Sequence, residues 1–501
     1  MIKPLLILGF ACITGSVYAL DSESATAVQI TTNKIQALRN NPAAHVHPII
    51  DTNVNDNYIK DQSYLQNPFR SLTMGGGTQY VTPEQKLNQN FAEHLFADGT
   101  WNVYGFSGIQ TNNNKPTSYN LSATMFGQTG SVAGFSLGGA FVAGNPLIQN
   151  SASSSGYPPY VFMTSEQYNA LSEAYLEYQY NHIVQADVGF IGINNSPWLA
   201  GSYYSDQSSA VTYQGALFNI NPGDGWIITA LGFNGANYPG YNGFTGNTLY
   251  NPGSIQGIGA GQPGAITQGS NGTVALGASY YTPDNLYNIR AWGYQFDNYA
   301  SLAYADSSLK LVVDKGTNTY FTIALQGGTE WGNSTNAITN AGLGNINSNF
   351  AGAQTAFNYD WFNLTAGYEN VWGPSDAYGN GAIVSPYTYN ENVDPMFANN
   401  WMTSLVQQAS AGQMYLITTT FSFMDNTISI APAYSQVLNT VAAAPLEEFD
   451  LVLNYKVKQI PGLKFFAVYA YQWIDQFTSQ TGTTAPQTNN WTTLFMTEYL
   501  Y

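Results

Sequence analysis

The sequence predicts an all-β chain that closes into a transmembrane antiparallel β-barrel of about 18 strands, within a range of 16–18. Three observations support this class. Charged residues make up 9% and aromatic residues 15% of the 501 residues, whereas about 25% of a typical soluble domain is charged. No apolar run of about 18 residues could cross a bilayer as a helix. Segments of about 10 to 13 residues alternate apolar and polar side chains, the period of strands with two different faces.

The first residues are typical of an export signal. Residues 1–19 read MIKPLLILGFACITGSVYA, with Lys3, a short apolar segment and small residues before a cleavage site expected after Ala19. The single cysteine, Cys12, lies inside this segment. Interpreting Cys12 as a lipoprotein cysteine is the weaker alternative, because the apolar segment continues beyond it. We therefore expect a signal peptide at 1–19 and a mature chain without thiols.

Residues 20–98 differ from the rest of the chain. They permit one short amphipathic helix and otherwise mix turn signals without a sustained period. We expect a periplasmic leader or a small plug within the barrel, and a disordered leader is an equal alternative. His45 and His47 lack nearby acidic or cysteine partners, so they make a poor metal site. The Gly-rich stretch 73–80 lacks the Gly-Lys-Ser/Thr of a phosphate loop, and we expect no cofactor.

Residues 99–501 carry the alternation that predicts the barrel. Phe449, Leu453 and Tyr455 share one face of an extended segment, and Asp450 and Asn454 lie on the other. The expected strands lie near 99–111, 117–128, 131–143, 170–181, 183–193, 208–219, 226–237, 271–282, 285–296, 299–312, 319–331, 348–358, 361–373, 412–423, 426–437, 447–457, 463–474 and 491–501.

The connections between these segments alternate in length. Tight ones, such as Tyr359-Asp360 and Met424-Asp425, are followed by long ones near 238–270 and 374–411. Short and long connections therefore fall at opposite ends of the strands. Outer-membrane barrels have this asymmetry, with short periplasmic turns and long extracellular loops.

The last ten residues, TTLFMTEYLY, place Phe495, Thr497, Tyr499 and Tyr501 on one face. In hydrocarbon every backbone polar group needs a partner, so the sheet has to close on itself. We expect this segment to pair with the first strand and to present an apolar outer face. A terminal aromatic on an alternating last strand also resembles the end signal that the barrel assembly machinery of Gram-negative bacteria reads.

Charge and histidine content limit the function classes. The formal net charge of −17 argues against nucleic acid as a partner. A general base near neutral pH is required by the hydrolases of outer membranes. His182 is the only histidine after residue 98, and it lies at an expected tight turn. We therefore do not expect an enzyme.

A barrel of 16–18 strands is too wide to be filled by its own side chains, so it normally encloses an aqueous channel. One long loop is expected to fold inward and narrow the channel. Asp376, Glu391 and Asp394 of the loop near 373–401 would then form a cation-favouring constriction. The alternative is an external, solvated loop whose carboxylates serve only solubility.

Two family resemblances follow from particular stretches. Residues 452–473, VLNYKVKQIPGLKFFAVYAYQW, resemble a late hairpin of the substrate-specific porins of the OprD type. The signal segment, the leader and the Tyr/Asn/Gly-rich barrel together resemble the legiobactin-receptor-like (LbtU-type) siderophore porins. Both resemblances imply uptake without a covalent cofactor. The arginine ladder of OprD-type porins is not matched, since Arg290 is the only arginine of the expected barrel.

These observations lead to one expected function and one alternative. The expected function is an outer-membrane porin for passive or substrate-selective uptake of small solutes, with iron–siderophore complexes as one solute class. The alternative is a surface barrel that acts through its loops as an adhesin or structural protein. TonB-type receptors fit less well, because they combine 22 strands with a plug longer than residues 20–98.

Overall fold

The structure is a computed structural model, and it describes residues 100–500 with gaps. The gaps are residues 113–114, 131, 149–166, 181–182, 194–195, 200–210, 224, 239–241, 247–269, 283–285, 388–394, 402, 407, 425–426, 440–444, 461, 475–476, 479–483 and 486–487. The expected signal segment 1–19, leader 20–98 and the terminal Tyr501 lie outside the described residues.

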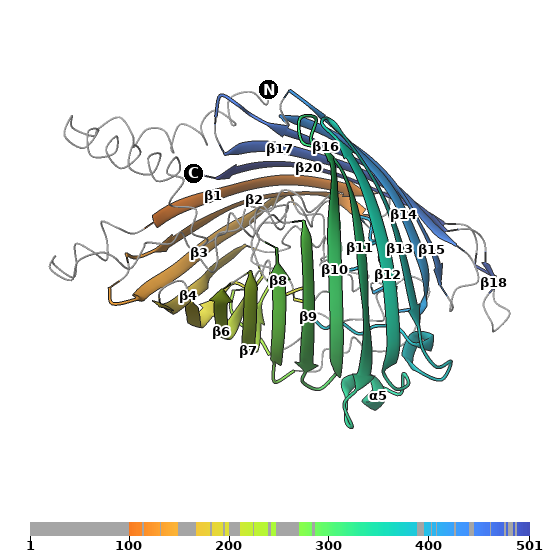
Figure 1. Cartoon of the computed structure of the whole chain (residues 1–501), viewed down its shortest axis with the longest axis horizontal. Helices are drawn as coiled ribbons and strands as arrows, with labels where there is room; N and C mark the ends of the chain where they lie inside the picture. The colour runs from red at the N-terminus through yellow and green to blue at the C-terminus, as the bar shows by residue number, and fades with distance from the viewer. Residues whose placement is uncertain are drawn as a thin grey trace. The chain divides into compact units, whose positions relative to one another are not determined.

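Long antiparallel strands make up nearly all of the described chain (Figure 1). The first half contains β1 (Thr100–Asn112), β2 (Lys115–Gln128), β3 (Phe135–Ile148), β4 (Tyr168–Tyr180), β5 (Val184–Ile191), β6 (Thr212–Gly223), β7 (Trp226–Asn237), β8 (Thr273–Tyr281) and β9 (Tyr287–Phe296).

The second half continues the same pattern and adds two short helical turns. It contains β10 (Ala300–Asp314), β11 (Thr319–Gly332), α5 (Ala337–Asn340), β12 (Asn347–Tyr359), β13 (Phe362–Trp372), the 3-10 helix η4 (Tyr378–Asn380), β14 (Gly412–Phe423), β15 (Ile428–Asn439), β16 (Leu446–Lys456), β17 (Leu463–Ile474), β18 (Phe477–Thr478), β19 (Thr484–Ala485) and β20 (Thr488–Leu500). Among the described residues, no helix is both long enough and apolar enough to cross a bilayer.

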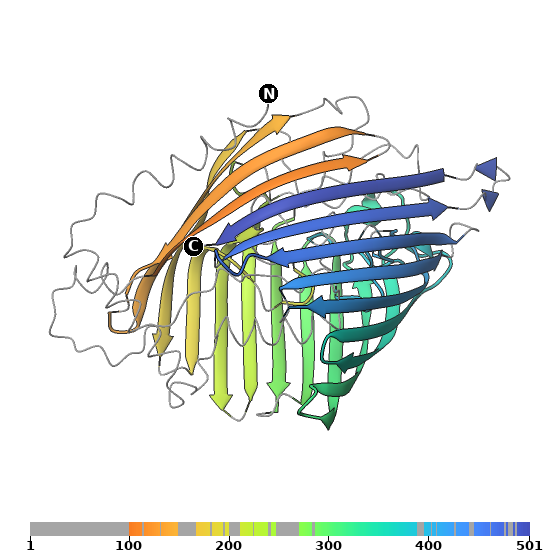
Figure 2. The same ribbon diagram turned by 90° about the horizontal axis from the view of Figure 1, so that it is seen from above.

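Eighteen of the strands form one closed sheet. Each long strand pairs antiparallel with its neighbours in the chain, and β20 pairs with both β17 and β1. Figure 2 shows β1 lying beside β20, so the sheet has no free edge. The expected pairing of the last segment with the first strand is confirmed, and so is the upper value of 18 strands.

The outer face of the sheet carries large apolar side chains. Leu121, Met125, Val274 and Leu325 are 49–66% exposed at alternate positions of their strands. On β20, Phe495 is 49% exposed, as the period-2 pattern predicts. A closed sheet with this surface meets the requirement of a hydrocarbon environment, because all ladder groups are paired and the outside is apolar.

The inner face carries the opposite residues of the same strands. On β16, Asp450 is fully buried while its neighbour Phe449 is 39% exposed. On β11, Gln326 points inward and Leu325 points outward. The inner face therefore carries polar side chains at these positions, together with buried apolar ones such as Phe466 on β17 and Leu494 on β20. Because one register shift would exchange both faces, this division also fixes the register.

Connection lengths divide as expected, with two differences. The β12–β13 turn is tight, since Tyr359 and Phe362 are paired and Asp360 adopts a left-handed φ of 41°. The β2–β3 connection is longer than the expected Thr129-Gly130 turn, because Ala133 and Gly134 also have positive φ and delay β3. At the opposite end, the β9–β10 connection spans only residues 297–299.

Candidate functional site in the barrel interior

The described part of the β13–β14 connection, residues 373–387 and 395–411 without 402 and 407, lies against the inner wall rather than outside the barrel. Its segment Met396–Asn400 is buried to 0–1% exposure. The backbone N–H of Val384 donates to Glu330 Oε2 at 2.8 Å, and the N–H of Phe397 donates to Glu369 Oε1 at 2.8 Å. Both carboxylates are inward-facing side chains, on β11 and β13. The wall therefore supplies acceptors for the loop's own backbone.

The later part of this loop is held in the same way by β16. The N–H of Trp401 donates to Asp450 Oδ2 at 3.0 Å, and the Thr403 hydroxyl donates to Glu448. Gln472 on β17 donates to Thr403 Oγ1 at 2.7 Å. Each hydrogen bond of this kind contributes about 0.5–1.5 kcal/mol, so the inward carboxyl groups together fix the path of the loop.

Two inward-facing glycines make room for these contacts. A Cβ on Gly367 would lie 2.4 Å from the carbonyl oxygen of Phe397. A Cβ on Gly352 would lie 2.0 Å from Glu369 Oε1, and the two residues face each other across β12 and β13. Any larger side chain at Gly367 would therefore push the loop away from the wall.

The loop also reaches the opposite part of the wall. The Tyr387 ring lies 5.0 Å from Phe233 on β7 and 6.3 Å from both Tyr213 on β6 and Phe296 on β9, measured between ring centroids. Burial raises the pKa of the Tyr387 phenol, so the ring stays neutral at physiological pH. Because Phe397 contacts β13 and Tyr387 contacts β6, β7 and β9, the described parts of the loop reach two separate parts of the wall and narrow the interior.

A second connection, between β5 and β6, also enters the interior. Trp198 is fully buried. Its ring meets Tyr304 of β10 and Phe350 of β12 edge-on, at centroid distances of 5.9 and 5.5 Å. Ser196 bonds to the hydroxyl of Tyr294 at 2.9 Å. The expectation that a long loop folds inward is therefore met by two loops.

A separate group of carboxylates lies on β4 and β5, close to the tight-turn end. Glu177 and Asp187 are directly opposite each other in the strand pairing. Glu177 accepts hydrogen bonds from Gln128 at 2.7 Å and Gln185 at 3.0 Å, and Gln185 also donates to Asp187 Oδ2 at 2.9 Å. Glu173 lies four residues before Glu177 on β4, and its side chain is also buried. We call Glu173, Glu177 and Asp187 the β4–β5 carboxylate group.

One carboxyl oxygen of Asp187 accepts no hydrogen bond from the described part of the wall. This atom, Oδ1, is buried and has no hydrogen-bond partner among the described residues. Two carboxylates in contact repel each other unless a proton or cation lies nearby. The group therefore presents negative potential toward the interior.

Buried bases are few and already neutralised. Arg290 forms a bidentate contact with Asp306, with Nε–O distances of 3.0 and 2.9 Å, and Lys464 pairs with Glu498. The buried charged side chains of the described strands comprise nine carboxylates and these two bases. The interior is thus acidic, and no arginine ladder lines the described wall.

The predicted constriction residues are only partly within the described chain. Asp376 is exposed at the start of the β13–β14 loop, next to η4. Glu391 and Asp394 lie outside the described residues, so the constriction they would form stays a prediction. The alternation of the sequence placed Asp450 on a polar strand face, but it indicated no role for Asp450, Glu330, Glu369 or Glu448.

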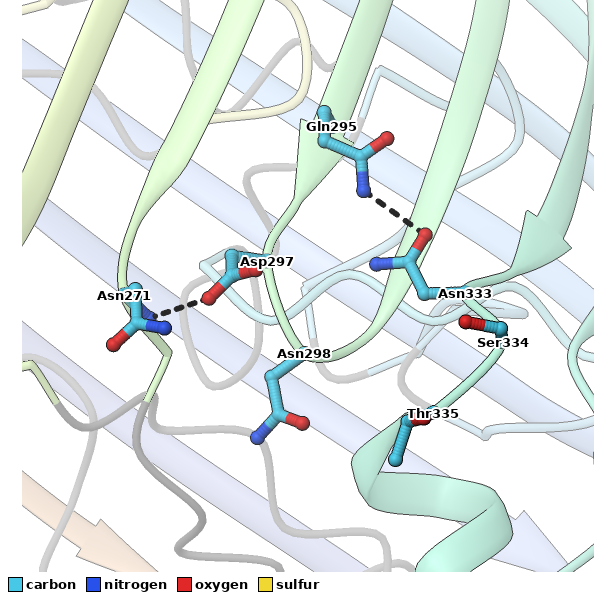
Figure 3. A pocket seen from close by; sticks show the side chains of 7 residues that line it. All are labelled: Asn271, Gln295, Asp297, Asn298, Asn333, Ser334 and Thr335. Atoms are coloured by element: carbon cyan, nitrogen blue, oxygen red, sulfur yellow. Dashed lines mark hydrogen bonds between the residues drawn. The ribbon is translucent and has the colours of Figure 1, made fainter.

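The described residues contain no group of three or more His, Cys, Asp or Glu side chains placed to hold a metal ion. A polar pocket of about 620 Å³ lies instead at the long-loop rim (Figure 3). It is lined by Asn271, Gln295, Asp297, Asn298, Asn333, Ser334 and Thr335. Gln295 is an outward position of β9, so this pocket lies apart from the interior.

Comparisons with known proteins agree on the fold. No protein-family model and no curated protein sequence matches the chain. Pseudomonas aeruginosa OpdK, solved with vanillate, is similar with a TM-score of 0.62 at 12% identity, covering 81% of this chain and 99% of that chain. Acinetobacter baumannii OccAB3 is similar with a TM-score of 0.62 at 15% identity, covering 81% and 100%.

Pseudomonas aeruginosa OccK2 (OpdF), solved with glucuronate, is also similar, with a TM-score of 0.59 at 12% identity and coverage of 81% and 98%. At these identities the likeness defines a class of fold: the 18-stranded barrel of the OprD-type outer-membrane porins. The expected likeness to OprD-type porins is therefore confirmed for the fold.

Proposed function

We propose that this chain is an outer-membrane channel for small solutes in a Gram-negative bacterium. The observation that carries the proposal is the closed sheet of 18 strands with an apolar outer face and an inner wall that bears buried amide, hydroxyl and carboxyl side chains. An apolar outer surface of this extent is unfavourable in water and is typical of contact with a membrane. Export through the signal segment 1–19, and insertion by the barrel assembly machinery through the last strand, belong to the same proposal.

The interior supports a preference for cationic over anionic solutes. OpdK and OccK2 were solved with vanillate and glucuronate. In this chain the buried arginine is occupied by Asp306 and carboxylates outnumber bases, so a carboxylate solute would find little complementary charge. The β4–β5 carboxylate group is the part of the wall that we propose attracts cations. Asp376, Glu391 and Asp394 are proposed to add to this preference at the loop.

Iron–siderophore uptake is a narrower proposal within the same function. The resemblance to legiobactin-receptor-like porins supports it, and a labelled ferric siderophore uptake assay in a deletion strain tests it. Unchanged uptake would remove this solute while leaving the channel proposal intact. The adhesin alternative is disfavoured, because the described parts of the β5–β6 and β13–β14 loops lie inside the barrel.

Planar-bilayer recording of the purified full chain tests the channel and its charge preference together. Open steps of porin size are expected, with a reversal potential in a KCl gradient that indicates cation preference. Glu177→Gln/Asp187→Asn removes the negative charge of this pair of facing carboxyl groups. Since two charges about 4 Å apart in water interact by about 1 kcal/mol, cation preference should fall by about fivefold.

Asp360→Asn is the matched control, because it removes one carboxylate at an exposed tight turn whose left-handed φ asparagine also accepts. Confirmed insertion without any conductance would contradict the channel. Conductance without cation preference would contradict only the charge assignment.

A further inference from the structure

The rim pocket of Figure 3 faces the outside of the barrel, not the solute path. Alternation along β9 places Tyr287, Ile289 and Gln295 outward and Arg290 inward. On β11, Trp331 is 48% exposed and Asn333 follows two residues later, on the same side. The pocket therefore opens at the outer surface where the apolar face of the sheet ends.

The short β9–β10 connection shapes this pocket. Residues from three strand ends converge there: Asn271 before β8, Asp297 and Asn298 between β9 and β10, and residues 333–335 after β11. Asp297 accepts from the backbone N–H of Asn271 at 3.1 Å, and Gln295 donates to Asn333 Oδ1 at 2.9 Å (Figure 3). The Ser301 hydroxyl donates in turn to Gln295 Oε1 at 2.6 Å. These bonds hold the amide groups in fixed orientations.

The lining has the chemistry of a hydroxyl-rich ligand. All seven lining side chains are amides, hydroxyls or a carboxylate, and none is basic. Amides and carboxylates together offer donors and acceptors that match vicinal hydroxyl groups. A phosphate would meet Asp297 with no compensating cation. A volume of about 620 Å³ is within the range of small-ligand sites, about 300–1,000 Å³.

An aromatic ring stands directly beside this polar network. Trp331 is paired with Ser301 across β11 and β10, which places their Cβ atoms about 4.5–5.5 Å apart. The exposed indole offers an apolar face to the C–H side of a sugar ring, while the amides next to it offer hydrogen bonds. The combination of a polar pocket and a flanking indole is independent of the channel interior.

The outer surface of the sheet next to the pocket carries several small side chains. Outward positions on β9 to β11 carry small residues, namely Ala291, Gly293, Ala303, Ala305 and Gly327, which are neighbours in the strand register. Bulky side chains border them, with Val274 at 66% exposure on β8 and Leu325 at 57% on β11. An acyl chain would fit along this strip, directly beneath a bound head group.

We propose that the rim pocket binds carbohydrate, and that its source is the sugar head group of an outer-leaflet glycolipid. Its membrane placement rests on the proposed function, but sugar binding is measured separately from conductance. Gln295 and Asn333 hydrogen-bond the sugar, Asp297 accepts from its hydroxyls, and Trp331 packs against a ring face.

The test uses the full chain in phosphatidylcholine nanodiscs. One arm titrates a fluorescent diglycosyl diacylglycerol, and the other titrates the same disaccharide free in solution. The Gln295→Leu/Asn333→Leu and Trp331→Leu variants should each weaken glycolipid binding by about tenfold. Trp372→Leu and Asn349→Leu are matched controls, because both residues are outward-facing near the same end of β13 and β12.

Binding of the lipid-linked probe alone, lost in the pocket variants and kept in the controls, supports the glycolipid source. Equal binding of the free disaccharide supports the carbohydrate site but moves its source to the extracellular medium. Failure of both probes to bind overturns the proposal, and so does equal weakening by the control variants. Migration as a folded barrel in unheated gels, with an unchanged melting temperature, verifies each variant.

Discussion

Inward-facing carboxyl groups occur both on the wall formed by β11–β16 and on that formed by β4–β5, but their surroundings differ. In the first region, Glu330, Glu369 and Asp450 each accept a backbone N–H from the β13–β14 loop. In the second region, Glu177 and Asp187 face amide side chains and each other. An inward carboxyl group therefore holds the loop in place where a backbone N–H group of the loop reaches it. Where no such donor reaches it, the group contributes negative electrostatic potential to the interior.

Deleting residues 382–408 should have the largest effect, because Tyr387 and Phe397 of this segment contact separate parts of the inner wall. Single-channel conductance should rise several-fold when the segment is replaced by a short Gly-Ser linker. Replacing residues 477–485, which include the small β18–β19 hairpin, is the control. An unchanged conductance would show that the β13–β14 loop does not limit the channel.

Gly367→Ala tests whether close approach to the wall holds the loop in place. The new methyl group would lie 2.4 Å from the Phe397 carbonyl oxygen, and relieving such overpacking costs about 1–3 kcal/mol. We expect frequent conductance fluctuations and faster proteolysis within the loop. Gly293→Ala has open space around its Cβ, so it should behave as the wild type. Equal behaviour of the two variants would remove the packing argument.

Exchanging one carboxylate in each region separates the two roles. Asp450→Asn weakens an anchor that Trp401 uses and should cost about 1–2 kcal/mol of loop attachment, measured as increased protease sensitivity. Asp187→Asn should leave proteolysis unchanged and shift the reversal potential toward lower cation preference. If both variants changed both measurements, the proposed division between anchor and potential would be wrong.

Tyr387→Phe should have the smallest effect at neutral pH, because the ring contacts with Phe233 and Phe296 are kept. Burial raises the pKa of the wild-type phenol, so its contribution is fully present below the unfolded value of about 10 and is lost as pH rises through the folded value. Alkaline pH should therefore increase conductance noise in the wild type but not in Tyr387→Phe. Equal noise in both chains would assign the alkaline effect to other groups.

Strand positions and faces were predictable because period 2 is a local property of the sequence. Phe449 and Asp450, for example, take the expected sides of β16. The inward path of the β13–β14 loop was expected only in general terms. Its anchors join Glu369 or Asp450 to backbone N–H groups, and a backbone donor leaves no signature in residue identity. The delayed start of β3 follows from positive φ at Ala133, which residue type does not indicate.

The rim pocket was not predicted for a related reason. Gln295, Ser301 and Asn333 are separated along the chain and meet only through the register of β9, β10 and β11. The sequence indicated a short connection between the strands that end near 296 and begin near 299. The pocket, however, also requires the ends of β8 and β11, which contribute the other lining residues.

The pairing of β1 with β20 joins Tyr104 to Leu500. These two residues are separated by nearly the full length of the chain that forms the barrel. Contacts of such large sequence separation form slowly, since the intervening chain has to be ordered first. Until that last pairing forms, the sheet has two edge strands whose unpaired backbone groups can pair with other chains. The barrel is therefore most prone to aggregate just before its last two strands pair. Loss of β20 should leave it as an open sheet with two unpaired edges.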